Sequence, residues 1–418
     1  MTTRYLTGIT TTGTPHLGNY VGAIRPAIAA SRNADTDSFF FLADYHALVK
    51  CDDPARIARS RLEIAATWLA CGLDPARVTF YRQSDIPEIP ELTWMLTCVT
   101  AKGLLNRAHA YKAAVDQNIA KGEDPDAAIN AGLYMYPVLM AADILVFNAN
   151  KVPVGRDQVQ HIEMARDVGQ RFNHLYGKAW RRVGGKDEPF VLPEAAIEES
   201  VATLPGLDGR KMSKSYDNTI PLFEGGARAT REAIAKIVTD SREPGEPKDP
   251  DSSSLFAIYR AFAGDAASTA FRRELERGLG WGGAKQKLFE RIDAEIEPLR
   301  ERYDSLMARP DEIEDALREG AKKARALAQP FIERLRGTVG LGALRKHPAA
   351  QAVAPVGFES AKVGKPALQQ VVFRENDTFA FKVLDAKKNV LANQAGFADP
   401  KAAMAAAREA MNNLAATN

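Results

Sequence analysis

Two lysines separated by Met-Ser, Lys211 and Lys214, stand in the segment Asp208–Ser215 (DGRKMSKS), just after a Pro-Gly turn. A flexible loop with two ammonium groups can close over a polyphosphate and stabilise the charge that develops on departing pyrophosphate. An isolated K-x-x-K segment is more often a solvated basic loop. The lysines therefore indicate phosphate chemistry only together with a nucleotide site elsewhere in the chain.

A turn rich in small residues, Gly13–Tyr20 (GTPHLGNY), follows the first apolar segment. A helix that begins just after a strand presents unpaired N–H groups and the positive end of its dipole, which suits phosphates. Gly18 has no side chain and lets a base or ribose approach the backbone, while His16 can donate to a phosphate oxygen. Neither G-x-G-x-x-G nor G-x-x-x-x-G-K-[ST] occurs at this turn. A simple tight connection is the alternative.

An acidic residue, Asp143, lies in the apolar segment Tyr134–Leu145 (YMYPVLMAADIL), which is expected to be a helix with Pro137 in its first turn. Helical spacing places Tyr136, Met140 and Asp143 on one face. An unpaired carboxylate on such a face is costly, so Asp143 needs a donor. Either another group of the protein supplies it, or a substrate does: an indole N–H is a donor without an acceptor, which a carboxylate matches.

The two lysine- and histidine-containing segments have a known counterpart. The turn ending in His16–Asn19, followed far downstream by Lys211–Ser215 (KMSKS), resembles the paired signatures of class I aminoacyl-tRNA synthetases, and Asn19 is usual in the tyrosyl/tryptophanyl branch. The block from Tyr134 to about Asn173 is very similar to tryptophanyl-tRNA synthetases. The resemblance covers about residues 4–340.

The resemblance implies the parts of an active site. Asp143 is expected to meet the indole nitrogen and Asp157 the ribose hydroxyls of ATP, with Gln158 and Tyr136 at the polar end of the amino acid. The implied catalytic residues are His16, Lys211 and Lys214. The implied ATP-binding residues are Thr10, Thr11, Thr12, Gly18, Asn19, Gly155, Arg156, Asp157, Leu204, Met212, Ser213 and Ser215. The implied tryptophan-binding residues are Asp143, Tyr136, Met140, Gln158 and His46.

Two positions depart from the family pattern, which usually has Gln-Pro at Thr10-Thr11 and Glu at Arg156. Thr10 is shorter but can still form a hydrogen bond to ATP or the amino acid, and we expect Arg156 to point to solvent or to phosphate. His161, on the helix after Gly155, is interpreted as a surface or core residue.

The implied chemistry needs no covalent catalyst, because the carboxylate of tryptophan is ionised at neutral pH and is already a nucleophile. Adenylation then depends on positioning and on charge, which we expect from His16, Lys211, Lys214 and a Mg²⁺ ion carried with ATP, without a metal site of the protein itself. The resemblance also implies tRNA(Trp) as partner and a homodimer.

These residues need an α/β frame, and the first half of the chain alternates apolar strands with amphipathic helices. We expect a Rossmann-like parallel-sheet catalytic domain over 1–225, a helical, anticodon-facing domain over 226–340, a linker over 341–365 and a small α+β module of unknown role over 366–418. The expected strands of the sheet are Arg4–Ile9, Ser38–Leu42, Val78–Arg82, Lys151–Val154 and Val201–Leu204. The module is expected to hold the strands Leu368–Phe373, Thr378–Leu384 and Val390–Gln394 and a helix over Pro400–Leu414.

A long helix is expected from Pro310, kinked at Pro330. Its apolar positions at helical spacing are Ile313, Leu317, Ala321, Ala324, Leu327, Ala328, Phe331 and Leu335. This helix and the linker carry a local basic excess that either contacts tRNA phosphates or forms a solvated face: Lys322, Lys323, Arg325, Arg334, Arg336, Arg345 and Lys346.

Composition limits the class of protein. The 418 residues carry a net charge of +2, so any RNA contact must be local. No apolar run approaches the roughly 20 residues that span a bilayer, and the start lacks the order of a signal peptide, so we expect a cytoplasmic protein. The three cysteines, Cys51, Cys71 and Cys98, form no CxxC pair and are expected to be reduced and buried.

Other functions remain open on sequence grounds. A tyrosyl-tRNA synthetase would share the fold and both signatures, and its phenol also pairs with an aspartate. A nucleotidyltransferase for small molecules uses a related His-x-Gly turn but does not need the long helical half. An inactive regulatory paralogue is disfavoured because His16, Lys211 and Lys214 are all present.

Overall fold

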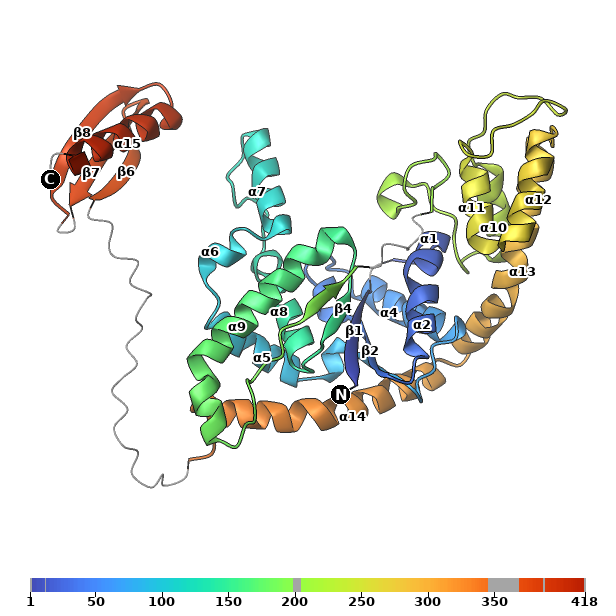
Figure 1. Ribbon diagram of the computed structural model, residues 1–418, viewed down its shortest axis with the longest axis horizontal. Helices are drawn as coiled ribbons and strands as arrows, with labels where there is room; N and C mark the ends of the chain where they lie inside the picture. Colours follow the sequence, from blue (N-terminus) through green and yellow to red (C-terminus); the bar gives the residue numbers. More distant parts are fainter. Residues whose placement is uncertain (1, 12, 198–203, 345–367, 386–387, 417–418) are drawn as a thin grey trace. The chain divides into compact units, whose positions relative to one another are not determined.

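The structure is a computed structural model that describes residues 2–11, 13–197, 204–344, 368–385 and 388–416 (Figure 1). It divides into two compact units, Met1–Ala343 and Leu344–Asn418. The expected boundary between a catalytic and a helical domain at residue 225 falls inside the first unit and stays a prediction. Most of the expected linker, from residue 345 to 365, lies outside the described residues.

The first unit is built on a parallel sheet of five strands in the order β3-β2-β1-β4-β5. The strands are β1 (Thr3–Thr10), β2 (Thr36–Ala43), β3 (Thr79–Arg82), β4 (Lys151–Pro153) and β5 (Glu194–Ala196). Residues Ser38 to Ala43 of β2 are buried in succession, as expected for a central strand covered on both faces. The predicted Rossmann-like α/β fold is confirmed.

The fifth predicted strand, Val201–Leu204, falls largely outside the described residues. Residues 201–203 lie outside the described residues, and Leu204 belongs to no extended strand. Leu204 is buried in a hydrophobic cluster beside Met212, which explains its apolar character without sheet pairing. The strand that pairs with β4 is the short segment Glu194–Ala196, whose three residues carry too little pattern to be recognised.

Helices cover the sheet and extend beyond it (Figure 1). Those of the sheet-containing part are α1 (Leu17–Asn19), the π-helix η1 (Tyr20–Ile24), α2 (Arg25–Ser31), α3 (Asp44–Ala47), α4 (Pro54–Ala70), η2 (Gln83–Asp85), α5 (Glu88–Thr97), α6 (Lys102–Leu105), α7 (His109–Lys121), α8 (Ala131–Leu145), η3 (Arg156–Gln158), α9 (Val159–Arg182) and η4 (Lys214–Tyr216). The helical part contains α10 (Gly226–Ala235), α11 (Ser254–Phe262), α12 (Asp265–Glu276), α13 (Trp281–Met307) and α14 (Pro310–Thr338).

Helix α8, which carries Asp143, begins earlier than predicted. The side chain of Asn130 caps it by accepting a hydrogen bond from the backbone N–H of Leu133 at 2.8 Å. Pro137 therefore lies inside the helix and not in its first turn, at a position where proline typically costs about 3 kcal/mol. The residues from Pro137 to Leu145 are mostly buried, and this packing holds the helix together.

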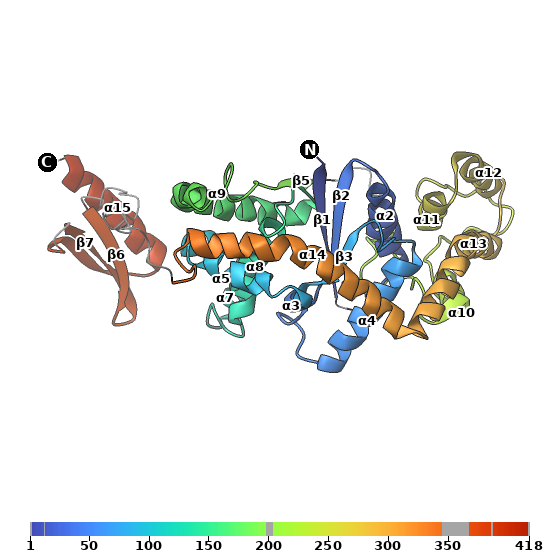
Figure 2. The same ribbon diagram turned by 90° about the horizontal axis from the view of Figure 1, so that it is seen from below.

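Helix α14 runs past strand β3, as Figure 2 shows. A Cβ atom built on Gly320 would lie 1.7 Å from the carbonyl oxygen of Phe80, so only glycine permits this approach. The helix continues through Pro330 to Thr338. Its predicted apolar positions are buried, except that Phe331 is half-buried and Leu327 is 43% exposed.

The second unit is an antiparallel sheet in the order β6-β7-β8 with one helix. Its elements are β6 (Leu368–Glu375), β7 (Thr378–Asp385), β8 (Val390–Phe397) and α15 (Pro400–Ala416), which confirms the predicted strands and helix. Phe381, Val383 and Ala407 form its core.

Three general expectations, on cysteines, metal sites and membrane spans, can be compared with the structure. Cys98 is exposed and the other two cysteines are only partly buried, so the prediction that all three are buried is wrong. Within the described ranges, no three His, Cys, Asp or Glu residues are grouped so that they could hold a metal ion. Among those same residues, no helix is both long and apolar enough to cross a membrane.

Candidate active site

The predicted site residues gather where the parallel strands end. Strand β1 leads into the turn before His16, β2 into the short helix with His46, β3 into Gln83, and β4 into η3. Carboxyl ends of parallel strands share one edge of a sheet, which is where such folds bind ligands.

His16 caps the helix that opens after β1. Its Nδ1 accepts from the backbone N–H of Asn19 at 3.3 Å, while Asn19 Oδ1 accepts from the backbone N–H of His16 at 3.1 Å. Burial, and then the charge of Lys214, lower the pKa of His16 to about 4. His16 is therefore neutral at neutral pH, with Nε2–H left to donate. Without a ligand His16 therefore carries no positive charge at neutral pH, and its contribution toward bound ATP, as charge or as donor, stays a prediction.

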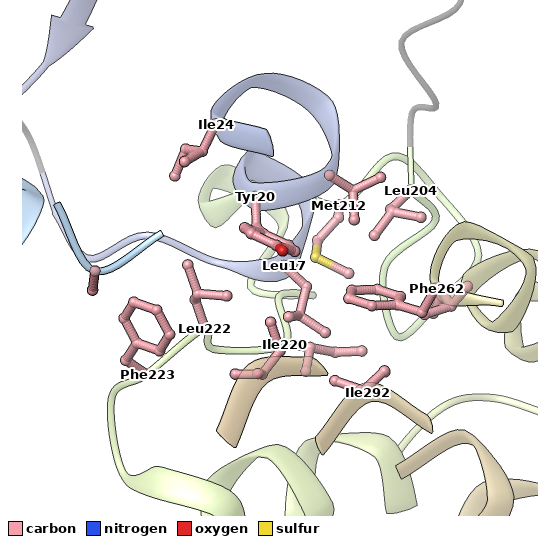
Figure 3. Close-up of a cluster of buried hydrophobic side chains, with 14 of the residues drawn as sticks. Leu17, Tyr20, Ile24, Leu204, Met212, Ile220, Leu222, Phe223, Phe262 and Ile292 are labelled. Atoms are coloured by element: carbon pink, nitrogen blue, oxygen red, sulfur yellow. The ribbon is translucent and has the colours of Figure 1, made fainter. Parts of the chain in front are cut away.

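The two signature segments are joined directly. The backbone N–H of Leu17 donates to the carbonyl of Ile220 at 2.9 Å, and that of Gly18 donates to the sulfur of Met212 at 3.3 Å. Figure 3 shows Leu17, Leu204, Met212 and Ile220 in one hydrophobic cluster. Leu204 and Met212, both expected to bind ATP, are 3% and 4% exposed, so their side chains pack inside the protein.

The turn after β1 is tightly built. A Cβ atom on Gly18 would lie 3.0 Å from the His16 ring and 3.3 Å from Met212 Cβ, so the lack of a side chain at Gly18 first of all permits this packing. Thr10 is exposed at the end of β1. Thr11 is only 1% exposed and donates to the carbonyl of Ala43 at 3.4 Å. Thr12 lies outside the described residues.

The lysine loop is held by a buried asparagine that was not predicted from the sequence. Asn218, 2% exposed, accepts from the backbone N–H of Ser213 at 2.8 Å and donates to Asp208 Oδ1 at 2.6 Å and to the carbonyl of Lys211 at 3.2 Å. Ser213 in turn accepts from the backbone N–H of Ser215 at 3.3 Å. These bonds shape a loop whose lysines are exposed.

Lys214 lies against the first turn. A side-chain carbon built on Gly13 would be 2.7 Å from Lys214 Nζ, and Gly13 has a φ of +73°, which favours glycine. Partial burial, and then the charge of Arg56, lower the pKa of Lys214. An ammonium group in this position gains most from an incoming anion, because the anion would offset both effects.

Asp143 is fully buried and already has donors. Its Oδ1 accepts from Gln83 Nε2 at 2.7 Å, and its Oδ2 lies 2.9 Å from His46 Nε2. Burial raises the pKa of Asp143, and the bonds to His46 and Gln83 oppose that shift. The alternative in which the protein supplies the donor is thus realised. Each oxygen keeps a lone pair for a further donor.

Hydrogen bonds join the residues that follow β2 and β3, next to Asp143. Gln83 Oε1 accepts from the backbone N–H of Tyr45 at 3.0 Å, and Ser84 donates to Asp44 through its backbone at 3.0 Å and its hydroxyl at 2.6 Å. Neither Gln83 nor Asp44 was predicted from the sequence. The only local signal was a polar residue directly after each buried strand.

A second chain of hydrogen bonds joins Tyr136 to Gln158. The Tyr136 hydroxyl lies 2.6 Å from His161 Nε2, and His161 Nδ1 lies 2.8 Å from Gln158 Oε1. An amide oxygen only accepts, so His161 Nδ1 carries a proton, and in the neutral tautomer this leaves Nε2 to accept from the Tyr136 hydroxyl. The interpretation of His161 as a surface or core residue missed this: it is buried, but it joins two predicted site residues.

The remaining predicted residues lie at or near the same strand ends. Met140 is half-buried on α8, between Tyr136 and Asp143 in sequence. Gly155 precedes η3, which contains Arg156, Asp157 and Gln158, and Arg156 is exposed.

The basic residues of α14 mostly contact the protein itself. Arg325 pairs with Glu88 at 3.0 Å, Arg336 pairs with Glu91 at 2.5 Å, and Lys323 donates to the carbonyl of Pro75 at 2.7 Å. Lys322 pairs with Glu319, and the guanidinium of Arg334 lies over the ring of Trp180. Arg345 and Lys346 lie outside the described residues. Lys322, Arg325, Arg334 and Arg336 are nevertheless exposed, so the tRNA contact and the solvated face both stay predictions.

Comparison with known proteins places this site in context. Residues 1–296 match the family described as class I tRNA synthetases (W and Y). The chain is 66% identical to the tryptophan–tRNA ligase of Pseudomonas aeruginosa over 98% of its own length and 88% of that protein. It is 64% identical to the corresponding ligase of Bordetella parapertussis over 98% and 87%. A crystal structure of tryptophanyl-tRNA synthetase from Campylobacter jejuni, complexed with ADP and tryptophan, superposes with a TM-score of 0.73 at 39% identity, covering 81% of this chain and 100% of that one.

Proposed function

The chain belongs to the class I tRNA synthetases for tryptophan and tyrosine, and we propose that it is a tryptophan–tRNA ligase. It activates L-tryptophan with ATP to tryptophanyl-adenylate and pyrophosphate, and then transfers the amino acid to the 3′-terminal adenosine of tRNA(Trp). The structural observation that carries this proposal is the direct joining of the His16 turn to the lysine loop, because it brings both phosphate-binding segments to one place.

ATP is held between these two segments. His16 donates through Nε2–H to a phosphate oxygen as a neutral group. Lys214, which lies against Gly13, and Lys211 on the same loop supply the positive charge for departing pyrophosphate. Mg²⁺ arrives with ATP, since this hard cation is held largely by substrate phosphates in sites of this kind.

Tryptophan is held by the two hydrogen-bond chains on α8. Asp143 accepts the indole N–H through a lone pair left by Gln83 and His46. We infer that the Tyr136 hydroxyl donates a hydrogen bond to Nε2 of the neutral His161 tautomer, so that its oxygen accepts from the α-ammonium group of the amino acid. Met140 contributes apolar surface to the indole slot.

Two wider features follow from family membership. A homodimer is proposed, and the exposure of Trp94 on α5, which is 70% exposed, supports a surface that a partner subunit covers. A cytoplasmic location is proposed because tRNA is charged where protein synthesis takes place.

The test is pyrophosphate exchange into ATP, measured with each of the twenty amino acids in turn. Exchange with tryptophan alone, followed by charging of tRNA(Trp), supports the proposal. Exchange with tyrosine would assign the chain to the sister specificity. Absence of exchange with any amino acid would mean a protein without the activating step.

A further inference from the structure

We propose that Gln83 is a positioning residue for tryptophan selection: its side-chain amide fixes the Asp143 carboxylate in the orientation that accepts the indole N–H. This inference rests on the proposed function, since it takes Asp143 as the indole acceptor. Gln83 itself is completely buried at the end of β3 and acts on the substrate only through Asp143.

The orientation of the Gln83 amide follows from its two partners. Its Oε1 lies 3.0 Å from the backbone nitrogen of Tyr45, which can only donate, so Oε1 is the acceptor. The other end is then the amide N–H group, which donates to Asp143 Oδ1 at 2.7 Å. One side chain thus connects the backbone after β2, the end of β3 and helix α8.

Together with His46, Gln83 fixes the rotation of the carboxylate. His46 holds Oδ2 at 2.9 Å from a second element, α3, so turning the carboxylate about its Cβ–Cγ bond would break both bonds. The His46 side chain is 20% exposed and that of Asp143 only 1%. The open side of the carboxylate is therefore the side of His46, and Gln83 forms the buried support behind it.

The bond to Gln83 also favours the charged form of the carboxylate. Burial raises the pKa of Asp143, the bonds and charge of His46 and the bond to Gln83 lower it, and the charge of Asp44 raises it. Tyr81 is also buried, and burial, followed by the charge of Asp143, raises the pKa of its hydroxyl. Removing the Gln83 donor therefore raises the pKa of Asp143 further, and the carboxylate is protonated at a higher pH.

The test compares Gln83→Met with the wild-type enzyme. Methionine has a similar length but cannot hydrogen-bond as an amide does. In tryptophan-dependent pyrophosphate exchange we expect the KM for tryptophan to rise about 10- to 100-fold, in keeping with the loss of one bond to a buried charged group. The KM for ATP should stay within about 2-fold, because the hydrogen-bond partners of Gln83, Tyr45 and Asp143, lie outside the predicted ATP segments.

A tryptophan analogue distinguishes selection of the indole N–H from a merely structural role of Gln83. β-(3-Benzothienyl)alanine replaces the indole N–H by sulfur and cannot donate. We expect the preference for tryptophan over this analogue to shrink in Gln83→Met by about the factor lost in the tryptophan KM. The pH below which the KM for tryptophan rises, the acid limb of its pH profile, should also be higher in Gln83→Met. An unchanged preference would overturn the inference.

Two further variants keep the result interpretable. Tyr81→Phe, two residues earlier on β3, is the matched control: its buried hydroxyl has no hydrogen-bond partner among the described residues, so its loss should leave the tryptophan KM within about 2-fold. Gln83→Glu keeps an acceptor for Tyr45 and should still weaken tryptophan selection and move its acid limb to higher pH; wild-type behaviour would contradict the inference. If the wild-type enzyme shows no tryptophan-dependent exchange, the proposed function fails instead.

Discussion

At the scale of single residues, some side chains of the site supply charge and others position the substrate, and we expect Lys214 to supply charge. Its ammonium group lies against the turn after β1 and is destabilised by partial burial and by Arg56. Replacing Lys214 with Ala should lower the rate of adenylate formation by about 100-fold or more, with a much smaller effect on ATP affinity, because the charge is needed most when pyrophosphate departs. Single-turnover kinetics with varied ATP measure both quantities. Equal losses in rate and in affinity would remove Lys214 from transition-state stabilisation.

His16 makes a prediction about stability. Its pKa is about 4 in the folded protein and 6.5 for an unperturbed histidine, so the unfolded chain binds more protons between these values. The stabilisation is present above pH 6.5 and is lost as the pH falls towards 4. After allowance for solvent screening of the Lys214 charge, it amounts to on the order of 2 kcal/mol.

His16→Asn keeps a good helix cap but has no titrating ring. We expect it to lose less stability than the wild type between pH 7 and pH 4.5, measured by urea unfolding followed by tryptophan fluorescence. All four tryptophans lie in the first unit, so this signal reports on the unit that contains His16. Parallel loss in both proteins would show that His16 is not the group responsible.

At the scale of elements, α14 fastens the helical part to the sheet. Arg325 pairs with Glu88, whose side chain is only 7% exposed. Arg325→Ala would leave this carboxylate without its partner, so we expect a loss of about 1–3 kcal/mol in stability and an unchanged Kd for tRNA. Lys322→Ala is the control, because its pair with Glu319 is exposed and should be worth under about 1 kcal/mol. Weaker tRNA binding without lower stability would indicate that Arg325 contacts RNA.

The same scale shows how far sequence reasoning reached. Apolar runs and helical spacing located four of the five strands and the buried stripe of α14, because these patterns reflect burial directly. The start of α8 and the strand β5 were missed, since packing overrode the proline signal and three residues carry no pattern.

In the site, sequence reasoning identified single residues better than their contacts. Asp143 was recognised as needing a donor, but its partners come from positions 46 and 83, and nothing local in the sequence specifies such pairing. The lowered pKa of His16 is a similar case. It depends on burial and on Lys214, and the lysine loop lies about two hundred residues away in the sequence.

At the scale of the whole molecule, the catalytic parts and the second unit are separable. Every predicted site residue lies in Met1–Ala343, and the second unit has its own core of Phe381, Val383 and Ala407. The Campylobacter jejuni structure is matched over its whole chain by 81% of this chain. We therefore expect adenylation to require only the first unit.

A chain ending at Ala343 should therefore keep tryptophan-dependent pyrophosphate exchange within about 2-fold of the full protein, because adenylation needs only groups at the strand ends of the first unit. Its thermal midpoint, followed by tryptophan fluorescence, should also be unchanged within about 2 °C, since each unit has hydrophobic clusters of its own. A tenfold loss of exchange would show that the second unit supports the catalytic frame. With exchange intact, the Kd for tRNA(Trp) of the shortened and full chains isolates the contribution of the second unit to RNA binding, because every other contact is shared.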